Sequence, residues 1–426
     1  MKLIHLLYLC LAVTFHVARM NAQSGWYIQH QDSLGPELLS IQFSDPSNGW
    51  TVGDGNTILH TEDGGKTWYH QTNPTTGNCL SDVCFVDSLH GWAAGSLQTI
   101  VHTTNGGESW EIQRHADEPN GIESICFADT VRGWAVGGVG WVDGHFILRT
   151  NDGGKTWDEQ TRGPGILRAA YFADSLRGLV VGDNGAIRST TDGGTTWTEK
   201  WSGTHANLFS LSFPRKLNGW VLGRSEWGHL SIVLRTTDGG ESWNEQFRDS
   251  TRWLAAIHFS DVHKGWVTGR SEEYASILHT TDGGKTWSEQ LTGIRHLTVR
   301  SIHFTDSVSG WSVGDRCTIF HTTDGGVTFI KHARAAEVPL RFMLGQNYPN
   351  PFNPTTRIAY GLAANVHVRL TVMNMLGQEV ATLVNGNQEV GYYEVTFDGK
   401  NLSSGLYFYR LQAGEFVAIK RLLLIR

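Results

Sequence analysis

The sequence predicts an all-β protein in which a seven-bladed β-propeller precedes a small C-terminal β-sandwich. Three observations predict this fold. One pattern occurs seven times between residues 24 and 333, each occurrence holds four short strand-like segments, and from residue 344 the pattern gives way to segments of alternating polarity. The composition agrees, because 50 of the 426 residues are glycine and 17 are tryptophan. Excess glycine beside aromatic residues is typical of many short strands joined by tight turns.

The N-terminal segment predicts a secretory signal peptide at residues 1–22. A short basic start, Met1-Lys2, precedes an apolar run from Leu3 to Val17, and small residues surround Ala22, where we expect cleavage. The run is too short to cross a membrane as a helix, and no other segment is long and apolar enough. The four cysteines beyond it fit no zinc-binding spacing, and we expect most of them to be unpaired: Cys79, Cys84, Cys126 and Cys317.

The most distinctive part of each repeat is a turn of the form TEDGGKTW, first seen at Thr61–Trp68. Its acidic position recurs at spacings of 42, 47, 40, 46, 44 and 42 residues, a period that indicates a propeller or a solenoid. An Asp side chain can accept hydrogen bonds from backbone N–H groups of the turn, and glycine permits positive φ. We therefore expect these seven positions to be structural: Asp63, Asn105, Asp152, Asp192, Asp238, Asp282 and Asp324.

The strands of a repeat follow a fixed spacing around this turn. The first strand ends in Phe, and seven residues later a Gly-Trp pair begins the second strand; only the fourth repeat has Leu179 in place of tryptophan. A third strand leads into the turn and a fourth follows it, which makes one four-stranded propeller blade. Gly25–Gln29 has the register of a fourth strand without its first three. We therefore expect it to close the ring against the last blade.

The loop between the second and third strands varies most. It is long in the third, fifth and sixth repeats and short in the others. Binding residues concentrate on loops that a rigid scaffold positions. Aromatic and charged residues in or beside these loops predict a surface for a glycan or a peptide, although aromatic residues that pack only their own loops remain the alternative. The candidates are Trp141, Trp201, Trp227, Trp253, Tyr274, Arg224, Arg270, Glu226 and Glu272, with Arg168 and Arg300 expected to line the central channel.

Other kinds of site are less well supported. A glycosidase needs two carboxylates about 5–10 Å apart, for which Asp143, Glu226, Glu272 and Glu273 are candidates. Histidines recur at one repeat position and are thus spread around the ring, so we expect no metal site and no cofactor. The net charge is −7 and no basic run occurs, which argues against a nucleic-acid partner.

The repeat resembles known families. The turn is similar to the Asp-box (BNR) repeat of sialidases, and the fuller unit, F-x-D-x(3)-G-W-x-V-G … I-x-x-T-x-D-G-G-x-T-W, resembles the photosystem II assembly/stability factor type of seven-bladed propeller. The Arg-Ile-Pro motif of sialidases is absent. The resemblance implies the propeller fold, and it leaves a role as an assembly or stability factor for a membrane protein complex open.

The C-terminal part forms a second domain at 344–426, after a linker at 334–343. Val366, Val368, Leu370 and Val372 alternate with polar residues, as in a strand. The pieces QNYPNPFNPTT, MLGQEVATLV, DGKNLSSGLYFYRL and KRLLLIR resemble the type A sorting domain of the type IX secretion system, an Ig-like module, with Met373 where that family commonly has Tyr. The resemblance implies Sec export to the periplasm of a Gram-negative bacterium. The type IX translocon would then recognise the tail and release the protein or attach it to the cell surface.

These observations lead to one hypothesis and two alternatives. The first is a secreted or cell-surface, non-enzymatic propeller that binds a protein or polysaccharide. The alternatives are a secreted glycoside hydrolase or lyase with a sialidase-like propeller, and an assembly factor for a membrane complex.

Overall fold

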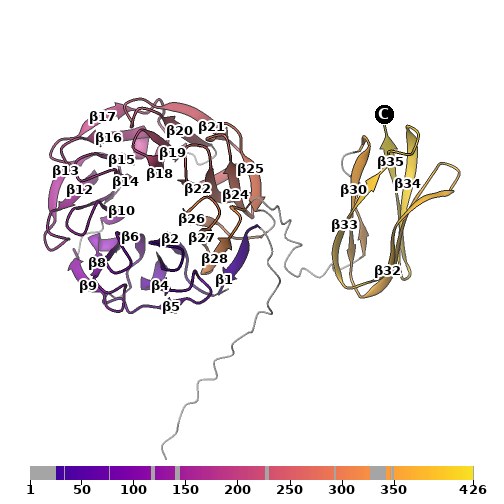
Figure 1. Ribbon diagram of the computed structural model, residues 1–426, viewed down its shortest axis with the longest axis horizontal. Coiled ribbons are helices and arrows are strands. Elements are labelled where there is room, and N and C mark those ends of the chain that lie inside the picture. The colour runs from indigo at the N-terminus through magenta and orange to yellow at the C-terminus, as the bar shows by residue number, and fades with distance from the viewer. Residues whose placement is uncertain are drawn as a thin grey trace, which may run out of the picture.

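The computed structural model describes residues 25–32, 34–75, 77–116, 120–139, 144–225, 230–291, 294–326, 342–345, 347 and 350–425. Within these ranges the chain forms two all-β domains, a ring of seven four-stranded antiparallel sheets and a C-terminal sandwich (Figure 1). The expected signal peptide at 1–22 and most of the expected linker lie outside the described residues. The domain boundaries at 24–333 and 344–426 therefore stay predictions.

Each blade has the predicted order of strands from the channel outward. The innermost strands are β2 (Leu38–Phe43), β6 (Leu80–Phe85), β10 (Gly121–Phe127), β14 (Leu167–Phe172), β18 (Asn207–Arg215), β22 (Arg252–Phe259) and β26 (Val299–Phe304). The second strands are β3 (Gly49–Gly53), β7 (Gly91–Gly95), β11 (Gly133–Val139), β15 (Gly178–Gly182), β19 (Asn218–Arg224), β23 (Gly265–Ser271) and β27 (Gly310–Gly314). The third strands are β4 (Ile58–Thr61), β8 (Ile100–Thr103), β12 (Gly144–Thr150), β16 (Ala186–Thr190), β20 (Ser231–Thr236), β24 (Tyr274–Thr280) and β28 (Thr318–Thr322).

The outermost strands complete the blades. They are β5 (Tyr69–His70), β9 (Glu111–Arg114), β13 (Asp158–Gly163), β17 (Thr198–Trp201), β21 (Asn244–Asp249), β25 (Ser288–Leu291) and, in the seventh blade, β1 (Tyr27–His30). Strand β1 pairs with β28 through Tyr27 opposite His321 and Ile28 opposite Phe320. The prediction that the N-terminal strand closes the ring is therefore confirmed.

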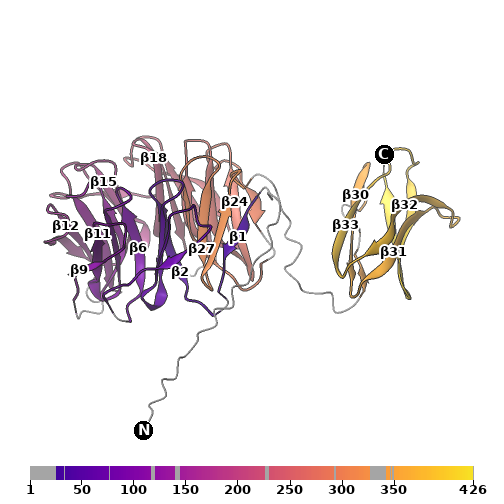
Figure 2. The same ribbon diagram turned by 60° about the horizontal axis from the view of Figure 1, so that its bottom comes forward.

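The strands run between two faces of the ring (Figure 2). We call the face with the connections between second and third strands the loop face, and the opposite one, with the DGG turns, the Asp-box face. Three short connections on the loop face contain 3₁₀ turns, η1 (Asp54–Asn56), η2 (Ser96–Gln98) and η3 (Asp183–Gly185). In the three blades with long connections, the second and third strands are longer instead; β23 and β24 pair from Gly265–Thr280 to Ser271–Tyr274.

The blades pack through the repeated aromatic residues. Trp50 of the first blade is fully buried and stacks on Phe85 of the second, with ring centroids 3.6 Å apart. Its Nε1 also donates a hydrogen bond to the Gly106 carbonyl of the next DGG turn, at 3.0 Å. This repeated contact explains why tryptophan and glycine are so abundant in the sequence.

The DGG turns are held by their own side chains. In the fourth blade Thr190 Oγ1 donates to Asp192 Oδ1 at 2.8 Å, and Asp192 accepts further hydrogen bonds from the backbone N–H and the hydroxyl of Thr196. The hydrogen bonds from Thr196 lower the pKa of Asp192 to about 2. The same contacts surround Asp63, Asp152, Asp238 and Asp282. These hydrogen bonds explain why the turn recurs in each blade, and the explanation requires no bound ligand.

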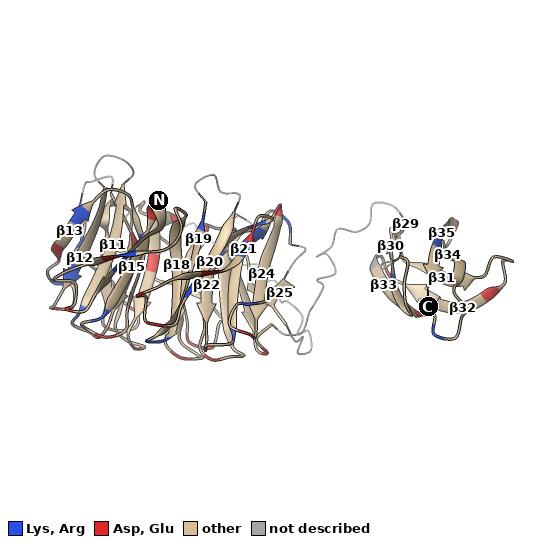
Figure 3. Ribbon diagram, turned by 90° about the horizontal axis from the view of Figure 1, so that it is seen from above, with Lys and Arg blue, Asp and Glu red and all other residues tan. Residues whose placement is uncertain are grey.

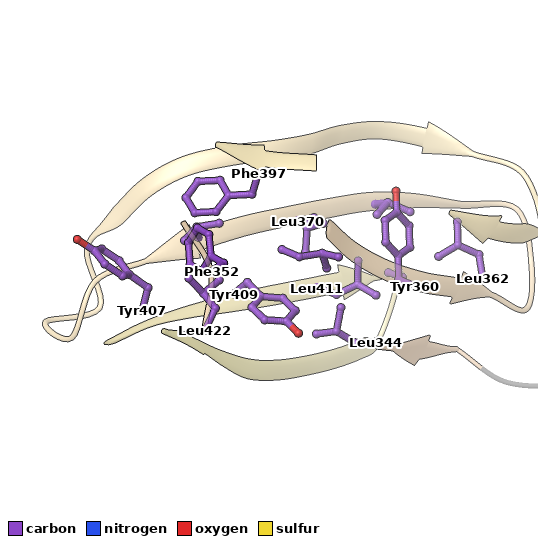
Figure 4. Close-up of a cluster of buried hydrophobic side chains, with 14 of the residues drawn as sticks. Leu344, Phe352, Tyr360, Leu362, Leu370, Phe397, Tyr407, Tyr409, Leu411 and Leu422 are labelled. Atoms are coloured by element: carbon purple, nitrogen blue, oxygen red, sulfur yellow. The ribbon is translucent and has the colours of Figure 1, made fainter. Parts of the chain in front are cut away.

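The C-terminal domain is a sandwich of two antiparallel sheets. One holds β29 (Met343–Leu344), β30 (Thr355–Leu362) and β33 (Gly391–Asp398). The other holds β32 (Glu379–Gln388), β31 (Val366–Met373), β34 (Gly405–Ala413) and β35 (Phe416–Leu424). Figure 4 shows the side chains that fill the space between the sheets, among them Leu370, Tyr409 and Phe397. The Tyr409 hydroxyl donates to the Gly345 carbonyl at 2.7 Å and accepts from the Asn347 N–H, which ties the start of the domain to its core.

The cysteines of the described residues are unpaired, as the sequence predicts: Cys79, Cys84, Cys126 and Cys317. Cys317 is buried and the other three are partly buried. Burial raises the pKa of the Cys79 and Cys84 thiols to about 12, so neither thiol is a ready nucleophile or metal ligand.

Candidate functional site

The central channel is lined by one equivalent residue from each innermost strand. This residue follows the buried apolar residue near the start of the strand, and because side chains alternate along a strand it points to the opposite side, into the channel. The cavity measures ≈ 440 Å³. The seven equivalent residues that line it are Leu39, Ser81, Glu123, Arg168, Phe209, Ala255 and Arg300.

Arg168 and Arg300 line this channel, and both form ion pairs with carboxylates. Arg168 Nε donates to Asp183 Oδ1 at 2.6 Å. Arg300 donates to Asp315 Oδ1 at 2.7 Å and pairs with Glu37 Oε2, also at 2.7 Å. Both arginines are partly buried, so these charge-assisted bonds fix their orientation.

A cluster of arginine and aromatic side chains lies where the channel opens on the loop face. Trp253 is the second residue of β22, the innermost strand of the sixth blade, and pairs across the sheet with Arg270. The guanidinium carbons of Arg224 and Arg270 lie 4.3 Å and 4.5 Å from the centre of the Trp253 ring. Arg224 also lies 5.0 Å from the ring centre of Phe209. We call Arg224, Trp253, Arg270 and Phe209 the channel-mouth cluster.

The channel-mouth cluster concentrates positive charge. Burial, and then the nearby charges of Arg168 and Arg270, lower the pKa of Arg224 to about 10. Among the described residues, Arg224 and Arg270 make no ion pair, in contrast to Arg168 and Arg300. Arg224 remains charged at neutral pH, so the cluster presents two guanidinium groups to an anionic ligand.

Two more carboxyl groups line the channel below this cluster. Glu123 lines the channel, and burial raises its pKa. Asp82 accepts hydrogen bonds from the Ser40 hydroxyl and from the Ile125 N–H, at 2.8 Å and 3.0 Å, and burial raises its pKa. These bonds join the first three blades, which gives Asp82 a structural role.

The remaining candidates lie at or beyond the edge of this cluster. Trp201 is 69% exposed at the end of β17, where it lines a separate pocket of ≈ 310 Å³ with Asp183. The Tyr274 hydroxyl accepts a hydrogen bond from Arg295 Nε at 3.0 Å, and Glu272 is exposed in the tight turn between β23 and β24. Trp141, Trp227, Glu226 and Asp143 lie outside the described residues.

Sequence reasoning missed several members of the site. Phe209 occupies the same strand position as Arg168 and Arg300, and that alignment was the signal that would have found it. Asp183 and Asp315 both follow the glycine that ends a second strand, where the fifth and sixth blades carry Arg224 and Arg270. This repeat position thus supplies the carboxylate partners of Arg168 and Arg300 in two blades and the channel-mouth arginines in two others.

The recurrent histidines pack against the interblade tryptophans. His60, His102, His279 and His321 each stack on the tryptophan of their own blade, with ring centroids 4.5–5.0 Å apart. Across the part of the chain that the structure describes, no group of three His, Cys, Asp or Glu side chains is placed to hold a metal ion. The same described residues contain no helix that could span a membrane.

The two faces of the ring differ in their charged residues. Acidic residues recur along the Asp-box rim (Figure 3), where turn aspartates such as Asp87 and Asp129 accept hydrogen bonds from backbone N–H groups. The unpaired arginines of the channel mouth lie on the loop face. The channel-mouth cluster therefore favours an anionic ligand on the loop face.

Comparisons with known proteins agree with both domains. Residues 18–77, 69–166, 164–248 and 201–296 match the model of the photosynthesis system II assembly factor YCF48 family. Residues 346–425 match the secretion system C-terminal sorting domain family. No curated protein matches the sequence.

Solved structures share the propeller fold. YCF48 bound to D1 peptide is 20% identical, with a TM-score of 0.56 over 71% of this chain and 98% of that one. YCF48 from Cyanidioschyzon merolae is 17% identical, with a TM-score of 0.55 over 70% of this chain and 98% of that one. A streptogramin B lyase is also 17% identical, with a TM-score of 0.54 over 70% of this chain and 97% of that one. At these identities the likeness shows the fold alone.

Proposed function

Because the chain belongs to the family of the photosynthesis system II assembly factor YCF48, we propose that its propeller is a non-catalytic module that binds an acidic segment of another protein at the channel mouth. The sorting domain indicates type IX export from a Gram-negative bacterium, so the propeller acts outside the cell or on its surface. We further propose that residues 1–22 direct the first step through Sec and that the translocon recognises residues 344–426.

The observation that carries the proposal is the pair of arginines over Trp253. Arg224 and Arg270 have no carboxylate partner among the described residues, and both make cation–π contacts with the Trp253 ring. A guanidinium group binds a carboxylate through two parallel hydrogen bonds. Two such groups beside the open channel suit a chain segment with closely spaced Asp or Glu side chains.

A polypeptide ligand has support from the family. A solved structure of YCF48 carries a bound D1 peptide, so one propeller of this family binds a peptide. The sorting domain favours an extracellular or surface protein as the partner here. The hydrolase and lyase alternatives depend in part on Asp143 and Glu226, which lie outside the described residues.

The experiment is a selection from a randomised 12-residue peptide library against the full-length chain, followed by calorimetry with the enriched peptides. We expect enrichment of Asp and Glu, and loss of binding in the double variant Arg224→Gln, Arg270→Gln. The matched control is Arg248→Gln, an exposed arginine of the fifth blade that pairs with Glu245 on the outermost strand. Binding of polygalacturonate in place of peptides would contradict a protein ligand, and release of reducing ends from it would contradict a non-catalytic module.

A further inference from the structure

Six of the seven blade interfaces in the described residues share one arrangement. A tryptophan of one blade stacks on the phenylalanine of the next with ring centroids 3.5–3.7 Å apart. Its Nε1 donates to the first glycine carbonyl of the next DGG turn at 3.0–3.2 Å. The tryptophans are Trp50, Trp92, Trp134, Trp220, Trp266 and Trp311.

The interface between the fourth and fifth blades lacks this indole. Leu179 stands in place of the tryptophan and has no N–H to donate to the Gly239 carbonyl. The glutamine that donates to the same carbonyl in four other interfaces is Lys200 here, and its Nζ pairs with Glu241 at 2.6 Å. The histidine or arginine beside the tryptophan is replaced by the small Ser189.

Other side chains occupy only part of the space that a tryptophan fills in the other interfaces. The Tyr171 ring stacks on Phe213 with centroids 4.7 Å apart and an angle of 8° between the planes, farther than in the six other interfaces. A pocket of ≈ 380 Å³ remains, open to the Asp-box face. Its lining includes Leu179, Tyr171, Phe213 and Gly239, with Leu217 at its rim. The volume lies within the roughly 300–1,000 Å³ range of small-ligand sites.

We propose that this pocket binds a tryptophan side chain presented by a protein partner. In the six intact interfaces an indole fills this position and its N–H donates to the equivalent glycine carbonyl. Here Tyr171 already stacks on the Phe213 ring, and the space beside the two rings, next to Gly239, is open. An inserted indole would pack beside Tyr171 and Phe213 and donate its N–H to the Gly239 carbonyl. The site lies on the opposite face from the channel-mouth cluster, so it does not depend on the function proposed above.

The experiment follows leucine methyl groups by NMR in the full-length chain, with N-acetyl-L-tryptophanamide as the probe. Leu217 reports on the pocket and is 59% exposed. Leu89 is its matched control, because it is 52% exposed at the equivalent place beside Trp50, where the indole is present. We expect a saturable shift at Leu217, none at Leu89, and none at either with N-acetyl-L-leucinamide. Equal shifts at both leucines, or no shift at Leu217, would overturn the proposal.

Two variants fill the pocket from different strands. Leu179→Trp restores the indole of the other interfaces, and Ser189→His restores the neighbouring ring. Each is expected to weaken probe binding at least tenfold while the other methyl signals keep their positions. A variant that retains the native spectrum and still binds the probe as the parent does would overturn the proposal. The two substitutions lie on different strands. If one variant does not fold, probe binding by the other variant still tests the proposal.

Discussion

The guanidinium carbon of Arg224 lies 4.3 Å from the centre of the Trp253 ring, although the two residues belong to different blades. The contact joins the end of β19 to the start of β22 at the channel mouth. A second guanidinium, from Arg270, lies over the same ring. Trp253 therefore positions both arginines to which we assign ligand binding.

Replacing Trp253 with leucine should weaken peptide binding more than it weakens the fold. Each cation–π contact at an exposed site contributes about 0.5–1 kcal/mol, so the loss of two corresponds to a factor of about 5 to 30 in Kd. Fluorescence anisotropy with a selected acidic peptide measures the change. Trp201→Leu, on the same face but 69% exposed, is the control, with a change of less than about twofold. Equal effects of the two substitutions would refute the role of Trp253.

Ring closure should depend on Trp26. This residue is 1% exposed, packs edge-on against Phe304 at 5.7 Å and donates from Nε1 to Gln290 at 3.1 Å. Trp26→Ala should lower the free energy of unfolding by about 3–5 kcal/mol, the usual cost of truncating a buried aromatic residue. Urea unfolding measures it. Leu34→Ala, at a residue 96% exposed, should leave the stability within about 0.5 kcal/mol.

Acid should destabilise the propeller in two pH windows. Burial lowers the pKa of His279 and His321 to about 4, whereas the unfolded chain takes up these protons near 6.5. Because the unfolded state then binds more protons, stability should fall as the pH drops from 6.5 to 4. Hydrogen bonds lower the pKa of Asp152 and Asp282 to about 2 from 3.8. Their contribution is present above pH 3.8 and should be lost as the pH falls towards 2.

Thermal unfolding at a series of pH values tests the first window. His279→Gln should reduce the drop in Tm between pH 7 and pH 5, whatever its effect on Tm at neutral pH. The exposed His263→Gln is the control for the loss of a histidine side chain. The same slope in His279→Gln as in the parent would contradict the assignment.

Passage from the periplasm out of the cell should require the C-terminal domain. Deleting residues 344–426 should leave the propeller in the periplasm, because the sorting domain is removed. Fusing residues 327–426 to a periplasmic reporter should carry the reporter out of the cell. Cell fractionation measures both, and normal secretion of the truncated chain would contradict the sorting role.

Much of the fold was predictable because the repeat is regular. The constant spacing from phenylalanine to tryptophan placed the first two strands of every blade, and the register of Trp26 predicted closure by β1. Arg168 and Arg300 were placed in the channel by their shared strand position. Local spacing is sufficient for these features because each depends on a single blade and its neighbour.

The site itself was less predictable. Trp253 and Arg270 pair across one sheet, but the approach of Arg224 depends on how two blades pack, which spacing within a repeat does not encode. Phe209 escaped notice because a lone aromatic residue in a strand looks like core. Leu179 was visible as an exception in the repeat, but the pocket beside it depends on how Tyr171 packs against Phe213.

The most direct test of the central claim is the affinity of the double variant Arg224→Gln, Arg270→Gln for a selected acidic peptide, measured by calorimetry beside Arg248→Gln. Hydrogen bonds to charged groups contribute about 1.5–3 kcal/mol each. The account therefore predicts that the double variant binds at least about a hundredfold more weakly, while Arg248→Gln binds as the parent does. Unchanged affinity in a folded double variant would contradict binding at the channel mouth.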